Sequence, residues 1–90
     1  MYNGWANKET WLVHLWLSND EASDEWCRAL AVDLRKPGRI AEAIQATVED
    51  ANPLLERSNA HGLYLDLLTT ALGHVEWREV ANAYYEAVRE

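Results

Sequence analysis

Residues 18–38 read SNDEASDEWCRALAVDLRKPG and carry the signals for a helix together with both of its ends. Ser18 or Asn19 can cap a helix over about residues 20–36, and the Pro37-Gly38 pair ends it. Acidic residues occupy its first turns and basic residues its last, the order that the helix dipole favours. Its apolar residues recur at three- and four-residue spacing: Ala22, Trp26, Ala29, Leu30 and Leu34. The stretch therefore predicts an amphipathic α-helix.

Helical patterns continue on both sides of this segment. Upstream, Asn7 can cap a helix to about Leu17 that is apolar almost all round, as expected of a buried central helix. Downstream, helices are predicted over about residues 39–51, 63–72 and 76–89, with a short helical turn at 53–57, a loop at 58–62 and Gly73 as a stop. The fourth helix is expected to direct one stripe inward: Tyr64, Leu67, Leu68, Ala71 and Leu72.

No segment alternates with the two-residue period of a strand. We therefore predict an all-α protein, a compact single domain over residues 1–90 with about five helices and short loops. Three of the five tryptophans are expected in its core: Trp11, Trp26 and Trp77.

Charge and composition exclude several classes. The chain of 90 residues has 15 Asp and Glu against 8 Lys and Arg, a formal net charge of −7. That balance argues against general nucleic-acid binding, which depends on basic surfaces. His14 breaks the longest apolar run, which is far below the ~20 residues that a membrane-spanning helix needs. Without a signal-peptide pattern, and with Cys27 as the sole cysteine, we expect a cytoplasmic location.

Catalytic and metal-binding signatures are missing from the sequence. His14, His61 and His74 are scattered, and none has another His or Cys at ligand spacing. Cys27 lies in mid-helix, where a packed thiol is commoner than a nucleophile, although Arg28 beside it could lower its pKa. The glycines are isolated, so no phosphate-binding loop is indicated. We expect no enzyme, catalytic residue, cofactor or metal.

The candidate partner-binding residues are acidic and aromatic. An acidic edge occupies the start of the second helix and could steer association with a basic surface. Two tryptophans outside the expected core could anchor a partner, because Trp is enriched at binding hot spots. The candidate set is Trp5, Trp16, Asp20, Glu21, Asp24 and Glu25.

Three alternatives stay open. The last two helices, separated by residues 73–75, could form a helix-turn-helix that contacts DNA with Arg78 and Arg89, aided by the basic turn of Arg35, Lys36 and Arg39. Carboxylates outnumber the arginines on the last helix, which counts against it. A self-associating structural protein, such as a symmetric dimer, would bury surplus aromatic surface. An enzyme using Cys27 or a histidine is the third.

The N-terminus NGWANKETW, residues 3–11, resembles that of a family of small proteins encoded by bacteriophages and mobile elements, whose shared opening is Asn-Gly, an Asn, and Glu-Thr-Trp. The resemblance extends to Leu15-Trp16-Leu17, Asn19-Asp20, Gly62-Leu63, Asp66-Leu67-Leu68, Ala71-Leu72 and VEWREVA at 75–81. Relatives commonly have Asn where this chain has Glu76, so we expect weaker side-chain capping there.

The resemblance implies a mobile-element setting and carries no active site with it. Ordinary structural chemistry accounts for the motif: Asn7 caps, Glu9 favours the helix N-terminus, and Thr10 bonds backbone in the first turn. We therefore expect a non-enzymatic helical module that binds a host protein with a basic surface. An inhibitor of a host defence system such as CRISPR is one concrete form.

Overall fold

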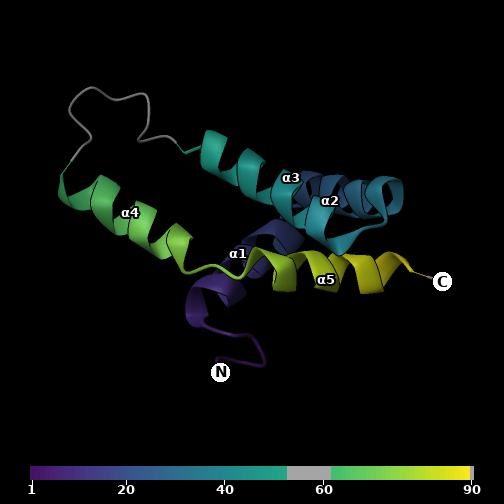
Figure 1. Ribbon diagram of the computed structural model, residues 1–90, viewed down its shortest axis with the longest axis horizontal. Helices are drawn as coiled ribbons and strands as arrows, with labels where there is room; N and C mark the ends of the chain where they lie inside the picture. The colour runs from purple at the N-terminus through teal and green to yellow at the C-terminus, as the bar shows by residue number, and fades with distance from the viewer. Residues whose placement is uncertain (53–61, 90) are drawn as a thin grey trace.

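The computed structural model describes residues 1–52 and 62–89, and these form five helices (Figure 1). They are α1 (Lys8–Asn19), α2 (Glu21–Leu34), α3 (Pro37–Asp50), α4 (Leu63–Gly73) and α5 (Trp77–Val88). Within the described ranges the only β-type pairing is an isolated bridge between Tyr2 and Trp5. The all-α prediction is confirmed. The predicted turn at residues 53–57 and most of the 58–62 loop lie outside the described residues.

The core lies where α2, α3 and α5 meet. Helix α5 contacts α3 most extensively and also packs on α2 and α1. Each of the three contributes an inward stripe at helical spacing. The buried members are Cys27 and Ala31 from α2, Ile40, Ala41 and Ile44 from α3, and Trp77, Val80, Ala81 and Tyr84 from α5.

Helix α1 is not the buried central helix that its composition predicts. Thr10 is its only fully buried residue, and the helix packs on the core with the partly buried Val13 and Leu17. Trp16 stands 73 % exposed on another face. Because apolar residues on all sides define no single inward face, the sequence could not show that α5 takes the central position.

The tryptophans divide differently from the prediction. Trp77 is buried as expected, at 8 % exposure. Trp11 is half-buried, with its ring centroid 5.1 Å from that of Tyr2. Trp26 is 38 % exposed, because the buried stripe of α2 runs through its neighbour Cys27 and through Ala31.

The α2–α3 corner corrects two predicted boundaries. Pro37 does not end a helix but begins α3, where its missing N–H costs nothing and its fixed φ suits a first helical position. Helix α2 ends at Leu34 and is followed by Arg35, which adopts the left-handed conformation with φ 54°.

At the N-terminal end of α2 the cap is Asp20, not Ser18 or Asn19 as predicted, because α1 continues to Asn19.

Helix α4 projects away from the other four helices at one end of the molecule (Figure 1). It has no buried residue, although Leu72 at its C-terminal end touches the core. The predicted inward stripe is therefore wrong in part: Tyr64 and Leu67 are 74 % and 58 % exposed. Leu68, Ala71 and Leu72 are partly buried, and Leu72 packs against the core, so the prediction holds only toward the C-terminal end of α4.

An N-terminal clasp joins the start of α1 to the segment before α5. Asn7 caps α1 as predicted, since its Oδ1 accepts a 2.9 Å bond from the Thr10 N–H. Thr10 Oγ1 donates to the same Oδ1 and accepts from the Glu76 N–H at 2.9 Å. Asn7 Nδ2 also donates to the His74 carbonyl at 2.7 Å. The side chains of Asn7 and Thr10 thus bond to backbone groups that lie 67 and 66 positions further along the chain.

Thr10 has a different role from the one predicted, whereas the weak side-chain capping predicted for Glu76 is confirmed. Instead of bonding backbone only within its own turn, the Thr10 hydroxyl satisfies a backbone N–H at the start of α5. The Glu76 side chain makes no capping bond to α5, in agreement with the weak capping expected there. A second carboxylate, Glu79, accepts the Ala6 N–H at 2.9 Å and extends the clasp.

Replacing Thr10 by valine should lower the free energy of unfolding by about 1–3 kcal/mol. The two side chains have nearly the same shape, but valine leaves the Glu76 N–H and one lone pair of Asn7 without a partner beside a buried side chain. Urea titration should show a lower midpoint with an unchanged slope. The matched control, Thr70→Val on the exposed side of α4, should change stability by less than about 0.5 kcal/mol. An equally small effect at Thr10 would contradict the clasp.

Candidate functional site: an acidic corner and an arginine-lined groove

The predicted partner-binding residues gather, with the exception of Trp5, at the junction of α1 and α2. We call this set the α1–α2 corner: Trp16, Asp20, Glu21, Asp24 and Glu25. The backbone connects its parts, because the Asp20 N–H donates to the Trp16 carbonyl at 3.2 Å. With most of its indole in water, Trp16 is the largest side chain on the corner.

Two of the four carboxylates at the corner have local structural duties. Asp20 Oδ2 accepts bonds from the hydroxyl and the N–H of Ser23, at 2.6 and 3.1 Å, and thereby caps α2. The hydroxyl bond, followed by the backbone bond, lowers the pKa of Asp20, so this carboxylate stays charged at neutral pH. Asp24 pairs with Arg28 Nε at 3.0 Å, one helical turn away. Glu21 and Glu25 are exposed and make no such bond to any residue that the structure describes, so they are the carboxylates open to a partner.

Trp5 occupies a different environment from Trp16. It is half-buried, and its ring centroid lies 4.6 Å from that of His14, whose own ring is 5.4 Å from Tyr84. This stack connects the N-terminal segment through α1 to α5. Trp5 therefore packs as part of the fold, and Trp16 is the better anchor of the two.

The interior beside this stack holds two titratable side chains, Cys27 and Tyr84, and an enzyme that used Cys27 would depend on the first. Burial raises the pKa of the Cys27 thiol to about 11, although the neighbouring Tyr84 hydroxyl opposes the shift. Burial likewise raises the pKa of Tyr84, whose hydroxyl lies beside Cys27 and has no well-aligned hydrogen-bond partner among the described residues. A buried thiol held in its neutral form is a poor nucleophile.

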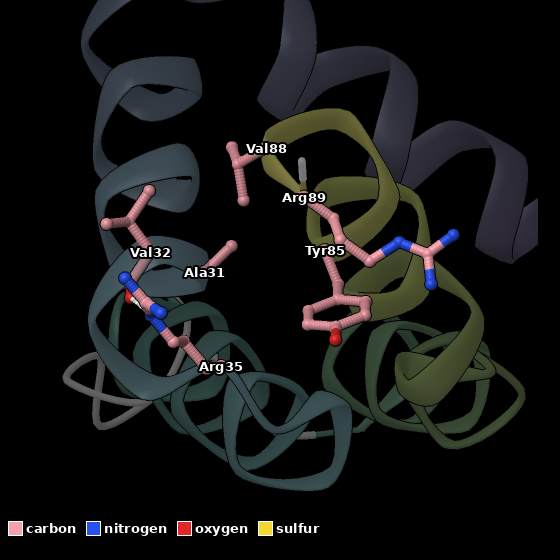
Figure 2. Close-up of a pocket in the computed structure, with 6 residues that line it drawn as sticks. All are labelled: Ala31, Val32, Arg35, Tyr85, Val88 and Arg89. Carbon is pink, nitrogen blue, oxygen red and sulfur yellow. Dashed lines mark hydrogen bonds between the residues drawn. The ribbon is translucent and has the colours of Figure 1, made fainter.

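Sequence reasoning missed a groove between α2 and α5, the α2–α5 groove (Figure 2). Its volume is about 390 Å³, and its walls are Ala31, Val32, Arg35, Tyr85, Val88 and Arg89. Figure 2 shows aliphatic side chains and the Tyr85 ring around the gap, with both guanidinium groups at its rim and turned away from it. In the sequence, Arg35 follows Ala31 by four residues and Arg89 follows Tyr85 by four, so each pair shares one face of its helix. No sequence pattern indicates that these two helix faces lie opposite each other.

Two of the cations predicted to contact DNA, Arg35 and Arg89, make local interactions. Arg35 Nε donates to the Val32 carbonyl at 3.0 Å, while Arg89 pairs with Glu86 at 2.9 Å. From α5, the guanidinium of Arg78 approaches Gly38, so the basic turn predicted at residues 35–39 gains a fourth cation. Helix α4 makes no extensive contact with α5 or any other described helix, so the last two helices do not pack as a helix-turn-helix pair.

Within residues 1–52 and 62–89, no group of three or more His, Cys, Asp or Glu side chains is arranged to hold a metal ion. Among the helices of the same residues, none is long and apolar enough to cross a membrane. The fold and surface thus define an all-α protein with an acidic corner and a separate arginine-lined groove.

The chain belongs to a protein family of unknown function, DUF7249, whose profile matches residues 1–86. This match covers nearly the whole chain, including the N-terminal clasp, the α1–α2 corner and most of the α2–α5 groove. Searches of curated proteins and of solved structures found no match.

His14 should titrate below its ordinary pKa of 6.5, because burial disfavours the charged ring more than Asp24 favours it. The unfolded chain then binds more protons, so stability should fall as pH decreases through 6.5 and level off below the folded-state pKa. NMR titration of the His14 ring would give this pKa directly. His14→Phe keeps an aromatic ring and should lose this component of the pH dependence between pH 7.5 and 5.5. A His14 midpoint at or above 6.5 would contradict the assignment.

Proposed function

We propose that this protein is a non-enzymatic binding module of a phage or mobile element that engages a basic surface on a host protein. The observation that carries the proposal is the exposure of Trp16, 73 %, beside the exposed carboxylates of Glu21 and Glu25 at the α1–α2 corner. A defence effector with a basic nucleic-acid groove, such as a CRISPR nuclease, is a partner of the required chemistry.

Trp16 suits the role of an anchor because its exposure brings the fold no benefit. A tryptophan can bury on the order of 150–250 Å² against a partner, and side chains of this type dominate binding energies at interfaces. Since Trp16 is largely in water, its removal should leave the core unchanged. A substitution at Trp16 can therefore test its contribution to binding without changing the stability of the fold.

Glu21 and Glu25 suit the role of steering charges. They lie one turn apart at the start of α2, where Asp20 and Asp24 add two further charges. An array of one sign raises association rates with a basic surface, and salt screens the effect. Reversing Glu21 and Glu25 is a cleaner test than reversing Asp24, because Asp24 is half-buried and its loss would break the pair with Arg28.

The test is capture of a host protein by the tagged chain, followed by binding kinetics with that purified partner. We expect Trp16→Ala to weaken affinity at least tenfold, mainly through faster dissociation, with an unchanged melting temperature. The Glu21→Lys, Glu25→Lys double variant should slow association at low salt and remove most of its salt dependence.

The charge control is the Asp33→Lys, Glu42→Lys double variant, which makes the same change in net charge at exposed positions away from the corner. It should affect association far less. Binding that is equal for both double variants, or insensitive to Trp16, would exclude the α1–α2 corner as the interface.

A second candidate function is self-association as a structural protein, which the exposed face of α4 favours. Leu63, Tyr64 and Leu67 are 67 %, 74 % and 58 % exposed, and Asp66 is the only charged residue of the helix. A second copy offers the same uncharged apolar face, and a two-fold axis would let the two faces cover each other.

Sedimentation at increasing concentration distinguishes this candidate from the first. If α4 mediates a dimer, Leu67→Glu should make the protein monomeric, whereas Ala87→Glu, at an exposed position of α5, should leave the dimer intact. A wild-type chain that stays monomeric at hundreds of micromolar would exclude self-association through α4.

A further inference from the structure

We propose that the α2–α5 groove binds a small organic anion, one that joins an apolar body to a single carboxylate, phosphate or sulfonate group. This site is separate from the α1–α2 corner and does not depend on the function proposed for it. The groove lies toward the C-terminal ends of both helices that form it, whereas the corner lies at the N-terminal end of α2.

The size of the groove favours a small molecule over a protein segment. Its volume of about 390 Å³ falls within the range of small-ligand sites, about 300–1,000 Å³. A partner helix, about 10–12 Å across with its side chains, would require far more room between α2 and α5. A small aromatic body fits this volume.

The walls of the groove account for the apolar part of the ligand. Val32 and Val88 face the gap from opposite helices, with Ala31 between them and the Tyr85 ring on the α5 side (Figure 2). Val32 is 47 % exposed, so a ligand would cover apolar surface that no described part of the chain covers. Burial of that surface would supply the non-directional share of the affinity.

The rim accounts for the anionic group. Of the five N–H donors on a guanidinium, Arg35 uses its Nε on the Val32 carbonyl and has no carboxylate partner among the described residues. Arg89 pairs with Glu86, but both side chains are more than half exposed, and such pairs are weak. Both guanidinium groups point away from the gap in Figure 2, so each would have to change rotamer to offer its forked donors to an anion in the groove.

The backbone of Arg35 supports a role beyond ending the helix. A residue in the left-handed conformation after a helix is most often glycine, because a Cβ is strained there. Here the position has φ 54° and carries an arginine whose side chain lines the groove. A glycine would adopt this conformation without strain, whereas the arginine found here places its side chain on the groove wall.

The probe for the test is 8-anilinonaphthalene-1-sulfonate, a two-part aromatic body with one sulfonate, titrated into the full chain at low salt. We expect saturable binding with one site in the groove. Amide chemical shifts should change at Ala31, Val32 and Val88, and should change little at the exposed α4 residues Leu63 and Leu67. The uncharged analogue N-phenyl-1-naphthylamine should bind at least tenfold more weakly.

Two pairs of variants separate the groove from general electrostatics. Arg35→Gly removes the guanidinium while relieving the backbone, so it should fold normally and weaken sulfonate binding about tenfold or more; Lys36→Gly removes the adjacent charge and should weaken it less than threefold. Val32→Glu places a carboxylate on the groove wall and should abolish binding, whereas Ala29→Glu adds the same charge at an exposed position outside the groove.

The outcomes are distinct. Shifts confined to the groove, with the expected order of variants, support the site. Shifts centred on α4, equal effects within each pair, or no saturable binding at millimolar probe would overturn it. Because no variant of the groove alters Trp16, Glu21 or Glu25, failure here leaves the proposed function of the α1–α2 corner standing.

Discussion

The Thr10 hydroxyl is the group on which the connection between the two ends of this chain depends. It is completely buried, donates to Asn7 and accepts the N–H of Glu76, so a single oxygen serves both the cap of α1 and the entry to α5. Helix α5 supplies more of the core than any other element, and its position is fixed at this entry. The motif residues Asn7 and Thr10 thus have a structural duty, which explains them without a ligand.

Local interactions were predictable, and distant ones were not. The Asn7 cap and the amphipathic stripe of α5 depend on neighbours within a turn or two, which is the range of sequence patterns. Pro37 was predicted to end a helix and instead begins α3. The bond from Glu76 to Thr10 spans 66 residues, and no local pattern contains it. The same limit explains α1: its composition is that of a buried helix, but burial depends on which helices lie beside it.

Surface roles follow the same division. The exposure of Glu21 and Glu25 was predictable from sequence, because glutamate is seldom buried and the N-terminal turns of a helix favour carboxylates. Their separation from Asp20 and Asp24 required the structure, which shows the cap to Ser23 and the pair with Arg28. The α2–α5 groove was out of reach altogether, since it exists only where Val32 on one helix faces Val88 on another.

Helix α2 carries two chemically opposite surfaces because of its own electrostatics. Carboxylates are stable at its N-terminal end and cations at its C-terminal end, each compensating the helix dipole. At ~1.5 Å per residue, its length places Glu21 and Arg35 about 20 Å apart, well beyond the ~8–10 Å over which salt at physiological strength leaves surface charges coupled. The corner would therefore repel an anion at the groove only weakly. The C-terminal ends of α2 and α5 carry partial negative charge, which Arg35 and Arg89 would have to offset for an anion to bind there. The net charge of −7 does not decide what either end can bind. The local charge decides it: α2 is negative at its N-terminal end and is followed by cations at its C-terminal end.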